Sequence, residues 1–144
     1  MVAESGKTLH CTVMTPEGRV FDGDADFVVA PASDGEVGIL PRHAPLITAL
    51  GAGALRVRRS GEVRHWLVIG GFLEVLDNHV SVLAHRIEAR ETIDVAQAER
   101  AMEEARAQAR QRKPGADEAP DPAQDPLVVA RARLQYARAF PVKN

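Results

Sequence analysis

The composition of this chain changes abruptly near residue 90, and that change divides the fold into two parts. Ten of the eleven glycines lie before it, among short apolar segments bounded by turn residues. The rest is rich in alanine, arginine, glutamate and glutamine at helical spacing, and its one glycine is Gly115. Because strands and helices have different hydrophobic periods, the pattern predicts a β domain over residues 1–90 and a helical domain over residues 91–144.

The first part predicts a series of short antiparallel strands. Residues 9–15 alternate inward and outward side chains, and Pro16-Glu17-Gly18 follows as a turn. Comparable segments recur as far as residue 84. They are separated by turn signals, among them Ser60-Gly61, Gly70-Gly71 and Asp77-Asn78. About eight to ten strands with turns this closely spaced indicate a closed or two-sheet antiparallel body.

The second part predicts two helices, over residues 93–113 and 127–139, joined as a hairpin. Thr92 is the expected N-cap of the first helix, and four prolines make residues 114–126 a loop. The apolar stripe of both helices is mostly alanine, which removes little apolar area from water. The hairpin is therefore expected to be held to the β body by about a few kcal/mol and to undock when a partner binds it better.

Charge and hydropathy exclude several classes of protein. The formal net charge is −2, which lacks the basic excess of a nucleic-acid binder. The longest uncharged apolar stretch, residues 44–55, is shorter than the roughly 20 residues of a membrane-spanning helix. The N-terminus has no hydrophobic signal segment, and the one cysteine, Cys11, has no partner for an internal disulfide. These features predict a soluble intracellular protein.

The sequence contains no catalytic constellation. Its five histidines show no metal-binding spacing, and no glycine-rich phosphate loop is present. Asp22, Asp24 and Asp26 begin like a calcium loop, but Phe27 occupies the glycine position and Ser33 the final glutamate position. We therefore expect no catalytic residue, no metal and no obligatory cofactor, and we interpret the three aspartates as a solvated turn.

Residues 34–50, DGEVGILPRHAPLITAL, closely resemble the most characteristic segment of the epsilon subunit of F-type ATP synthases. Further matches follow in the order of that family. They are GAG at 51–53, GGFLEV at 70–75 and VSVLA at 80–84, and the helical hairpin comes last. The resemblance implies a mainly β fold followed by α: a ten-stranded antiparallel β-sandwich with a C-terminal two-helix hairpin.

The resemblance also implies a function and partners. Members of that family are non-catalytic rotor subunits of the central stalk, which bind the gamma subunit and the c-subunit ring and couple proton translocation to ATP synthesis. In bacteria they act at the cytoplasmic face of the plasma membrane, without a membrane span of their own. Their hairpin docks on the sandwich or extends into the alpha/beta catalytic hexamer and inhibits ATP hydrolysis.

Three residues are candidates for the rotor interface. Glu36, Arg42 and His43 fall in the segment whose loops face the c ring and gamma in the family. Polar side chains on turns suit a docking surface. The alternative is that Pro41 and Pro45 shape a turn that His43 caps.

An ATP-sensing module, with nucleotide between sandwich and hairpin, is the alternative function. Some bacterial members bind ATP through an Ile/Leu-Asp-x-x-Arg-Ala motif, and this chain keeps Ile93, Asp94 and Ala98 of it. Gln97 replaces the arginine, and a neutral amide does not supply its charge-assisted contacts to phosphate. Further candidates on the second helix are Arg131 and Arg138, whose other interpretations are a solvated edge or a contact with acidic surface on the catalytic subunits.

Overall fold

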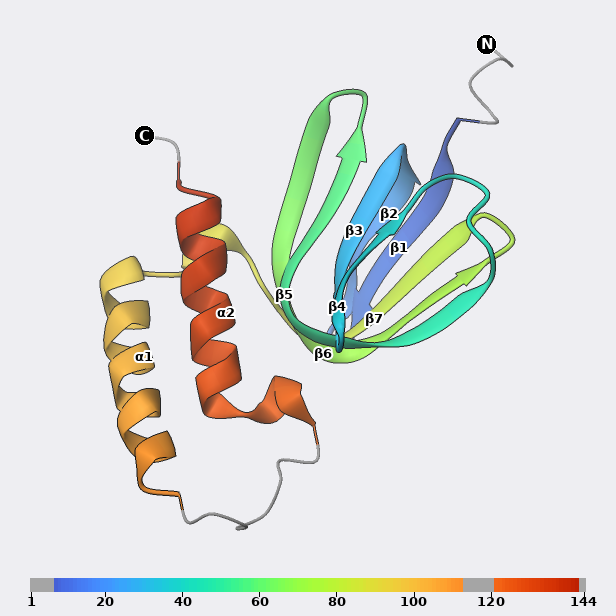
Figure 1. The fold of residues 1–144 in the computed structure, drawn as a ribbon. Helices are drawn as coiled ribbons and strands as arrows, with labels where there is room; N and C mark the ends of the chain where they lie inside the picture. The colour runs from blue at the N-terminus through green and yellow to red at the C-terminus, as the bar shows by residue number, and fades with distance from the viewer. Residues whose placement is uncertain (1–6, 113–120, 143–144) are drawn as a thin grey trace.

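The computed structural model describes residues 7–112 and 121–142 as seven strands, two α-helices and two short 3-10 helices (Figure 1). The strands are β1 (Leu9–Thr15), β2 (Gly18–Ala25), β3 (Phe27–Ala32), β4 (Gly35–Ile39), β5 (Leu46–Arg59), β6 (Glu62–Leu76) and β7 (His79–Glu88). The helical elements are η2 (Arg90–Thr92), α1 (Val95–Arg110), η3 (Pro122–Gln124) and α2 (Pro126–Ala139). Within the described ranges, neither α-helix has the length and apolar character needed to cross a membrane.

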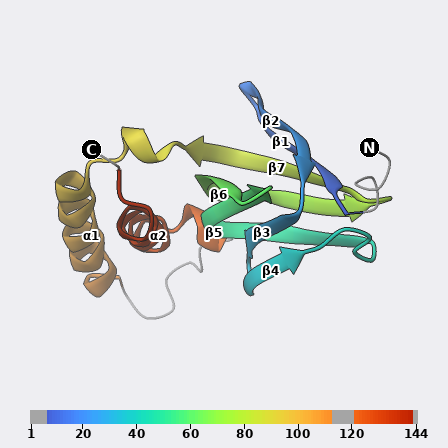
Figure 2. The same cartoon turned by 90° about the horizontal axis from the view of Figure 1, so that it is seen from above.

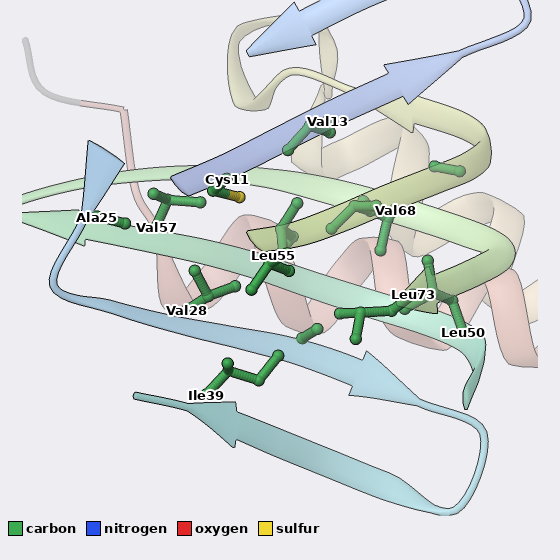
Figure 3. Close-up of a cluster of buried hydrophobic side chains, with 14 of the residues drawn as sticks. Cys11, Val13, Ala25, Val28, Ile39, Leu50, Leu55, Val57, Val68 and Leu73 are labelled. Carbon is green, nitrogen blue, oxygen red and sulfur yellow. The ribbon is translucent and has the colours of Figure 1, made fainter. Parts of the chain in front are cut away.

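All seven strands belong to one sheet in the order β2-β1-β7-β6-β5-β3-β4. Every neighbouring pair is antiparallel except β1 and β7, which run parallel. Buried side chains from all seven strands meet in one cluster, so the sheet is folded around a single core (Figures 2 and 3). Cys11 and Val13 of β1, Leu55 of β5 and Val82 of β7 are fully enclosed there.

The expectation of a ten-stranded, wholly antiparallel sandwich is wrong in strand number and in one pairing. Residues 46–50 and 55–59, expected as separate strands, are one continuous strand β5 of 14 residues. Residues 63–69 and 72–76 likewise form the 15-residue strand β6. Glycines at these junctions let the paired strands bend together while the hydrogen-bonded ladder continues on both sides of the bend.

Gly71 shows why the bend in β6 requires glycine. Its φ is +119°, a value that side chains of L-residues rarely adopt. A Cβ atom built there would collide with the carbonyl oxygen of Leu83 on β7. The bend therefore brings β7 closer to the β6 backbone than any other residue type permits.

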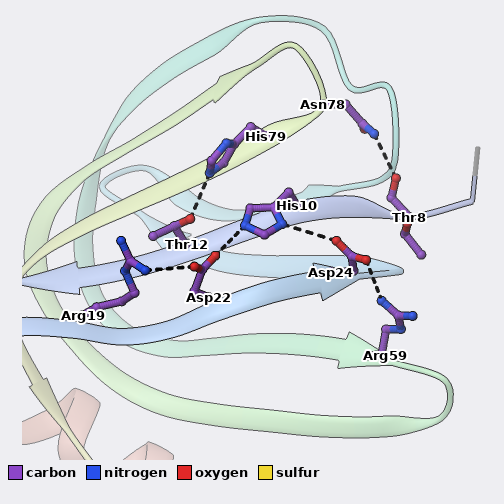
Figure 4. A network of polar contacts seen from close by, with 9 residues as sticks. All are labelled: Thr8, His10, Thr12, Arg19, Asp22, Asp24, Arg59, Asn78 and His79. Atoms are coloured by element: carbon purple, nitrogen blue, oxygen red, sulfur yellow. Dashed lines mark hydrogen bonds and ion pairs between the residues drawn. The ribbon is translucent and has the colours of Figure 1, made fainter. Parts of the chain in front are cut away.

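The aspartates expected to form a solvated turn lie instead in and beside β2, at the edge of the sheet. The side chain of His10 on β1 lies between the carboxylates of Asp22 and Asp24 (Figure 4). Asp24 also pairs with Arg59, at 3.3 Å. The two carboxylates raise the pKa of His10 above its ordinary value, chiefly through the bond to Asp22. An edge strand with one exposed face needs no apolar alternation, and its charges hinder pairing with other sheets.

Helix α1 begins after Asp94, whose carboxylate accepts a hydrogen bond from the Gln97 amide at 3.1 Å. The expectation that Thr92 caps a helix beginning at residue 93 is wrong. Thr92 closes the η2 turn instead, where its hydroxyl donates to the carbonyl oxygen of Ala89 at 2.7 Å. Aspartate is the better cap at neutral pH because its charge also faces the positive end of the helix dipole.

The two helices form the expected hairpin, with ends that differ from the prediction. Helix α1 ends at Arg110, and the predicted stop at Pro114 and Gly115 lies outside the described residues. Helix α2 begins after Asp125, which accepts a hydrogen bond from the Leu127 amide at 2.9 Å. An ion pair of 3.2 Å between Arg112 and Asp125 joins the two ends of the loop.

Helix α2 lies between α1 and the sheet (Figures 1 and 2). It is therefore buried on two sides, and its buried residues are Ala130, Ala132, Leu134, Tyr136 and Ala137. A second cluster of buried side chains joins α1 and α2 to Leu67 and Ile69 of β6. These two β6 residues point away from the main core, so the hairpin covers an apolar strip of the outer sheet surface.

Candidate functional site

A second part of the outer sheet surface is apolar and exposed. Met14, Leu83 and Phe72 are paired neighbours on β1, β7 and β6, so their side chains form one row across three strands. Phe72 is 55% exposed and Leu83 51%. Ile47 of β5, 73% exposed, and Leu76 of β6 stand beside the row on the same face. We call these five residues the outer apolar patch.

Glu74 divides the outer apolar patch into two hollows. One, of about 380 Å³, has Met14 and Leu83 in its wall, and the other, of about 360 Å³, has Ile47 and Leu76. Glu74 lines both. Exposed apolar side chains that are contiguous and have few charges among them, here Glu74 and Arg19, are typical of a surface that binds another protein.

The predicted interface residues Arg42 and His43 lie in the turn between β4 and β5. Arg42 has a φ of +66°, and its amide donates to the side-chain oxygen of Asn78 at 2.8 Å. The amide of Asn78's side chain donates in turn to the Thr8 carbonyl (Figure 4). Within the described part of the chain, His43 bonds only to the backbone of its own turn, with its ring nitrogen 2.7 Å from the Ala44 carbonyl oxygen. This end of the sheet is a fixed platform from which the Arg42 side chain projects into solvent.

Glu36, the third predicted interface residue, lies apart from the other two. It stands near the beginning of β4, and its carboxylate pairs with Arg56 of β5 at 2.9 Å. Both side chains line a groove of about 430 Å³ whose other wall is formed by α2, including Tyr136, and by Phe140 just after it. Glu36 therefore belongs to the hairpin-facing side of the sheet, whereas Arg42 and His43 belong to the turn end.

The motif residues Ile93, Asp94 and Ala98 line one small cavity. Its volume is about 280 Å³, and Gln97 is also in its wall. Neither of the predicted α2 arginines lines it. Arg131 is exposed, and Arg138 pairs with Glu99 at 3.2 Å.

Arg133 is the α2 arginine that reaches this cavity, and the sequence analysis missed it. Its guanidinium makes two hydrogen bonds, of 2.8 and 2.7 Å, with the carboxylate of Glu88 at the end of β7. These bonds lower the pKa of Glu88 and raise that of Arg133. Arg133 also lines a larger cavity of about 670 Å³ between the hairpin and the sheet. The sequence could have predicted that Arg133 faces inward. It lies three residues after Ala130 and four before Ala137, and those positions share a helix face.

An aromatic cluster joins the end of α2 to β6. The ring of His65 stacks on Phe140 with centroids 4.1 Å apart, and its Nδ1 lies 2.9 Å from the Tyr136 hydroxyl. Burial lowers the pKa of His65 below its ordinary value, with Arg90 adding to the effect and Glu91 opposing it. Burial raises the pKa of Tyr136 to about 12, so its hydroxyl stays protonated and donates to the His65 carbonyl oxygen at 3.4 Å.

Comparisons with known proteins identify the family. Residues 8–90 match the beta-sandwich domain of the ATP synthase delta/epsilon chain. The ATP synthase epsilon chain of Halalkalibacterium halodurans is 39% identical over 132 residues, which are 92% of this chain and 92% of the relative. This chain belongs to the ATP synthase epsilon chain family. The epsilon chain of Pelotomaculum thermopropionicum is 50% identical over 97 residues, which are 67% of this chain and 72% of that one.

The fold agrees with this epsilon chain membership. A chain of the Euglena gracilis mitochondrial ATP synthase, from a cryo-EM structure of its OSCP, F1 and c-ring, superposes with a TM-score of 0.72. The identity is 21%, and the match covers 93% of this chain and 82% of that one. The family confirms the resemblance found in residues 34–50 and the expectation of a non-catalytic subunit of the ATP synthase central stalk.

The pKa of His65 makes docking of α2 dependent on pH. Because the docked state lowers this pKa, it binds fewer protons than the released state, and docking weakens as pH falls through about 6.5. We expect protection factors of α2 amides, corrected for intrinsic exchange, to fall between pH 7.5 and 5.5. Glu88 has a lowered pKa too, but its contribution is lost only below about pH 4.5, outside this window.

The matched variant is His65→Phe, which keeps a ring to stack on Phe140 and removes the titrating group. Its α2 protection is expected to be the same at both pH values. An equal decrease in the wild-type and His65→Phe chains would assign the pH dependence to another group.

Proposed function

We propose that this chain is a rotor subunit that binds the gamma subunit through the outer apolar patch and rests on the c-subunit ring through the turn bearing Arg42 and His43. In this role residues 1–90 are the docking domain that couples proton translocation to ATP synthesis. The exposure of Met14, Leu83 and Phe72 in one row across three strands is the observation that carries the proposal.

The chemistry of the outer apolar patch favours a permanent protein partner. Its large apolar side chains gain about 25 cal/mol for each Å² that a partner removes from water. Arg42 offers a different chemistry, an exposed cation on a turn held by hydrogen bonds, which suits polar loops of a ring of subunits. Attachment to such a ring supports a peripheral location at the cytoplasmic face of a bacterial membrane.

We propose further that residues 91–144 are a regulatory hairpin that inhibits ATP hydrolysis when it leaves the sheet and extends into the alpha/beta hexamer. The small size of the buried side chains of α2 supports this proposal. Three of its buried residues are alanines, and α1 reaches the sheet mainly through α2. An element attached through small side chains undocks at modest cost and binds elsewhere.

The first prediction of this proposed function concerns the outer apolar patch. Phe72→Ser is expected to weaken binding to gamma at least tenfold, because it removes the largest exposed apolar side chain of the row, at its β6 end. Binding is measured by titration of the purified chain onto a gamma-containing complex. The control is Val63→Ser, which changes a 47% exposed side chain near the start of β6. Equal affinities for the two variants would remove the patch from the gamma interface.

The second prediction concerns the hairpin. An ATP synthase reconstituted with a chain that lacks residues 91–144 is expected to hydrolyse ATP several-fold faster than one with the full chain, because the inhibitory element is absent. The measurement is steady-state hydrolysis, with gamma binding of the truncated chain as the control. Unchanged hydrolysis with normal binding would restrict the protein to coupling.

ATP sensing is a second candidate function, favoured by one observation. Ile93, Asp94 and Ala98 line a single cavity with the Arg133 guanidinium, a cation on the facing helix. Arg133 supplies the charge that Gln97 does not. In this role, ATP bound between sheet and hairpin would stabilise the docked state.

Calorimetry of the full chain with ATP tests this candidate. Binding is expected to release heat below millimolar ATP and to be lost in Arg133→Gln, which keeps a polar side chain without the charge. Arg131→Gln is the control, because Arg131 is exposed and does not line the cavity. Absence of heat up to millimolar ATP would exclude nucleotide sensing.

A further inference from the structure

Arg90 is the one charged side chain that is buried among the described residues, with 7% of its surface exposed. It lies in η2, the short turn that joins the sheet to the hairpin. Its Nε donates to the carbonyl oxygens of Ala137 at 3.2 Å and Phe140 at 2.7 Å, and one terminal nitrogen donates to that of Ile93 at 2.9 Å. No ion pair joins Arg90 to a carboxylate within residues 7–112 and 121–142. Its charge is therefore satisfied by backbone alone.

Two of these carbonyls lie at the C-terminal end of α2. The last carbonyls of a helix have no partner within the helix and carry the negative end of its dipole. A guanidinium presents several donors in a fixed plane and remains charged at every physiological pH. Arg90 therefore caps α2 from outside the helix, across 47 residues of sequence from Ala137.

The same connecting segment holds α2 a second time. Glu88, two residues before Arg90, binds the Arg133 guanidinium in the middle of α2. This connecting segment thus contacts α2 at two points, one near the middle of the helix and one at its end. The same segment must change direction if the hairpin extends. If this segment swings away from α2, the contacts that Arg90 and Glu88 make with the helix break together.

The burial of the Arg90 charge makes the contact between Arg90 and α2 reversible. A guanidinium loses hydration when it is buried, and backbone carbonyls compensate this loss without the full attraction of a carboxylate. Release returns both the guanidinium and the carbonyls to water, so much of the cost of breaking the bonds is recovered. Replacement of Arg90 alone is different, because it leaves the α2 carbonyls buried without a donor.

We propose that Arg90 is a latch that holds α2 in the docked state by capping its C-terminal end. The latch deepens the proposed regulatory function, since it sets how readily the hairpin becomes available to a partner. The docking equilibrium, rather than the fold of the sheet, is the property that Arg90 controls.

Amide hydrogen exchange of the full chain tests the latch. Arg90→Met keeps most of the side-chain length and removes all donors. Its α2 amides are expected to exchange at least tenfold faster than those of the wild-type chain, with unchanged exchange in β5 and β6. Arg90→Lys keeps the charge but has one nitrogen in place of the planar fork, so a smaller acceleration is expected. Arg100→Met is the matched control, because it removes an exposed arginine of α1.

Two outcomes would overturn the latch. One is α2 exchange within twofold of wild type in both Arg90 variants. The other is equal loss of protection in the sheet and in α2 of Arg90→Lys, which would make Arg90 a general requirement of the fold. Since neither measurement involves ATP hydrolysis, a latched hairpin that fails to inhibit the enzyme would contradict only the proposed function.

Discussion

The burial of β6 on both of its faces is the constraint on which the docked structure depends. Trp66 and Val68 point into the main core, whereas Leu67 and Ile69 point outward and are covered by the hairpin. Leu67 has no exposed surface, and Ile69 is 7% exposed. Each such side chain contributes about 1.5–3 kcal/mol when it is removed from water. The sheet therefore needs a cover over this strip, and α2 provides it.

The outer surface of the sheet is in this way divided between an internal and an external partner. The strip at Leu67 and Ile69 is covered by the chain's own helix, while the outer apolar patch, further along the same long strand at Phe72 and Leu76, remains exposed. The bend at Gly70-Gly71 separates the two regions. A single strand thus connects the surface proposed to bind the rotor with the surface that holds the regulatory hairpin.

The sequence predicted the elements better than their continuity. Period-two alternation located the strands and alanine-rich spacing located both helices, because both patterns reflect local burial. The strand number was wrong because glycines such as Gly51 and Gly70, which usually end strands, here allow long strands to bend. Arg133 had a signal in its helical spacing, but Arg90 had none. Its partners are backbone carbonyls about 50 residues away, and no pattern of side chains in the sequence predicts a contact with backbone.

The parallel pairing of β1 with β7 has a consequence for biogenesis. His10 pairs with His79 and Met14 with Leu83, so β1 has one of its two neighbours next in the chain, β2, and the other, β7, about 70 residues later. Closure of the sheet must wait for translation of nearly the whole β domain, and pairing of such distant segments is slow. The helices follow the β domain in the chain. The sheet can therefore close before the hairpin has been synthesised and can compete for the sheet surface.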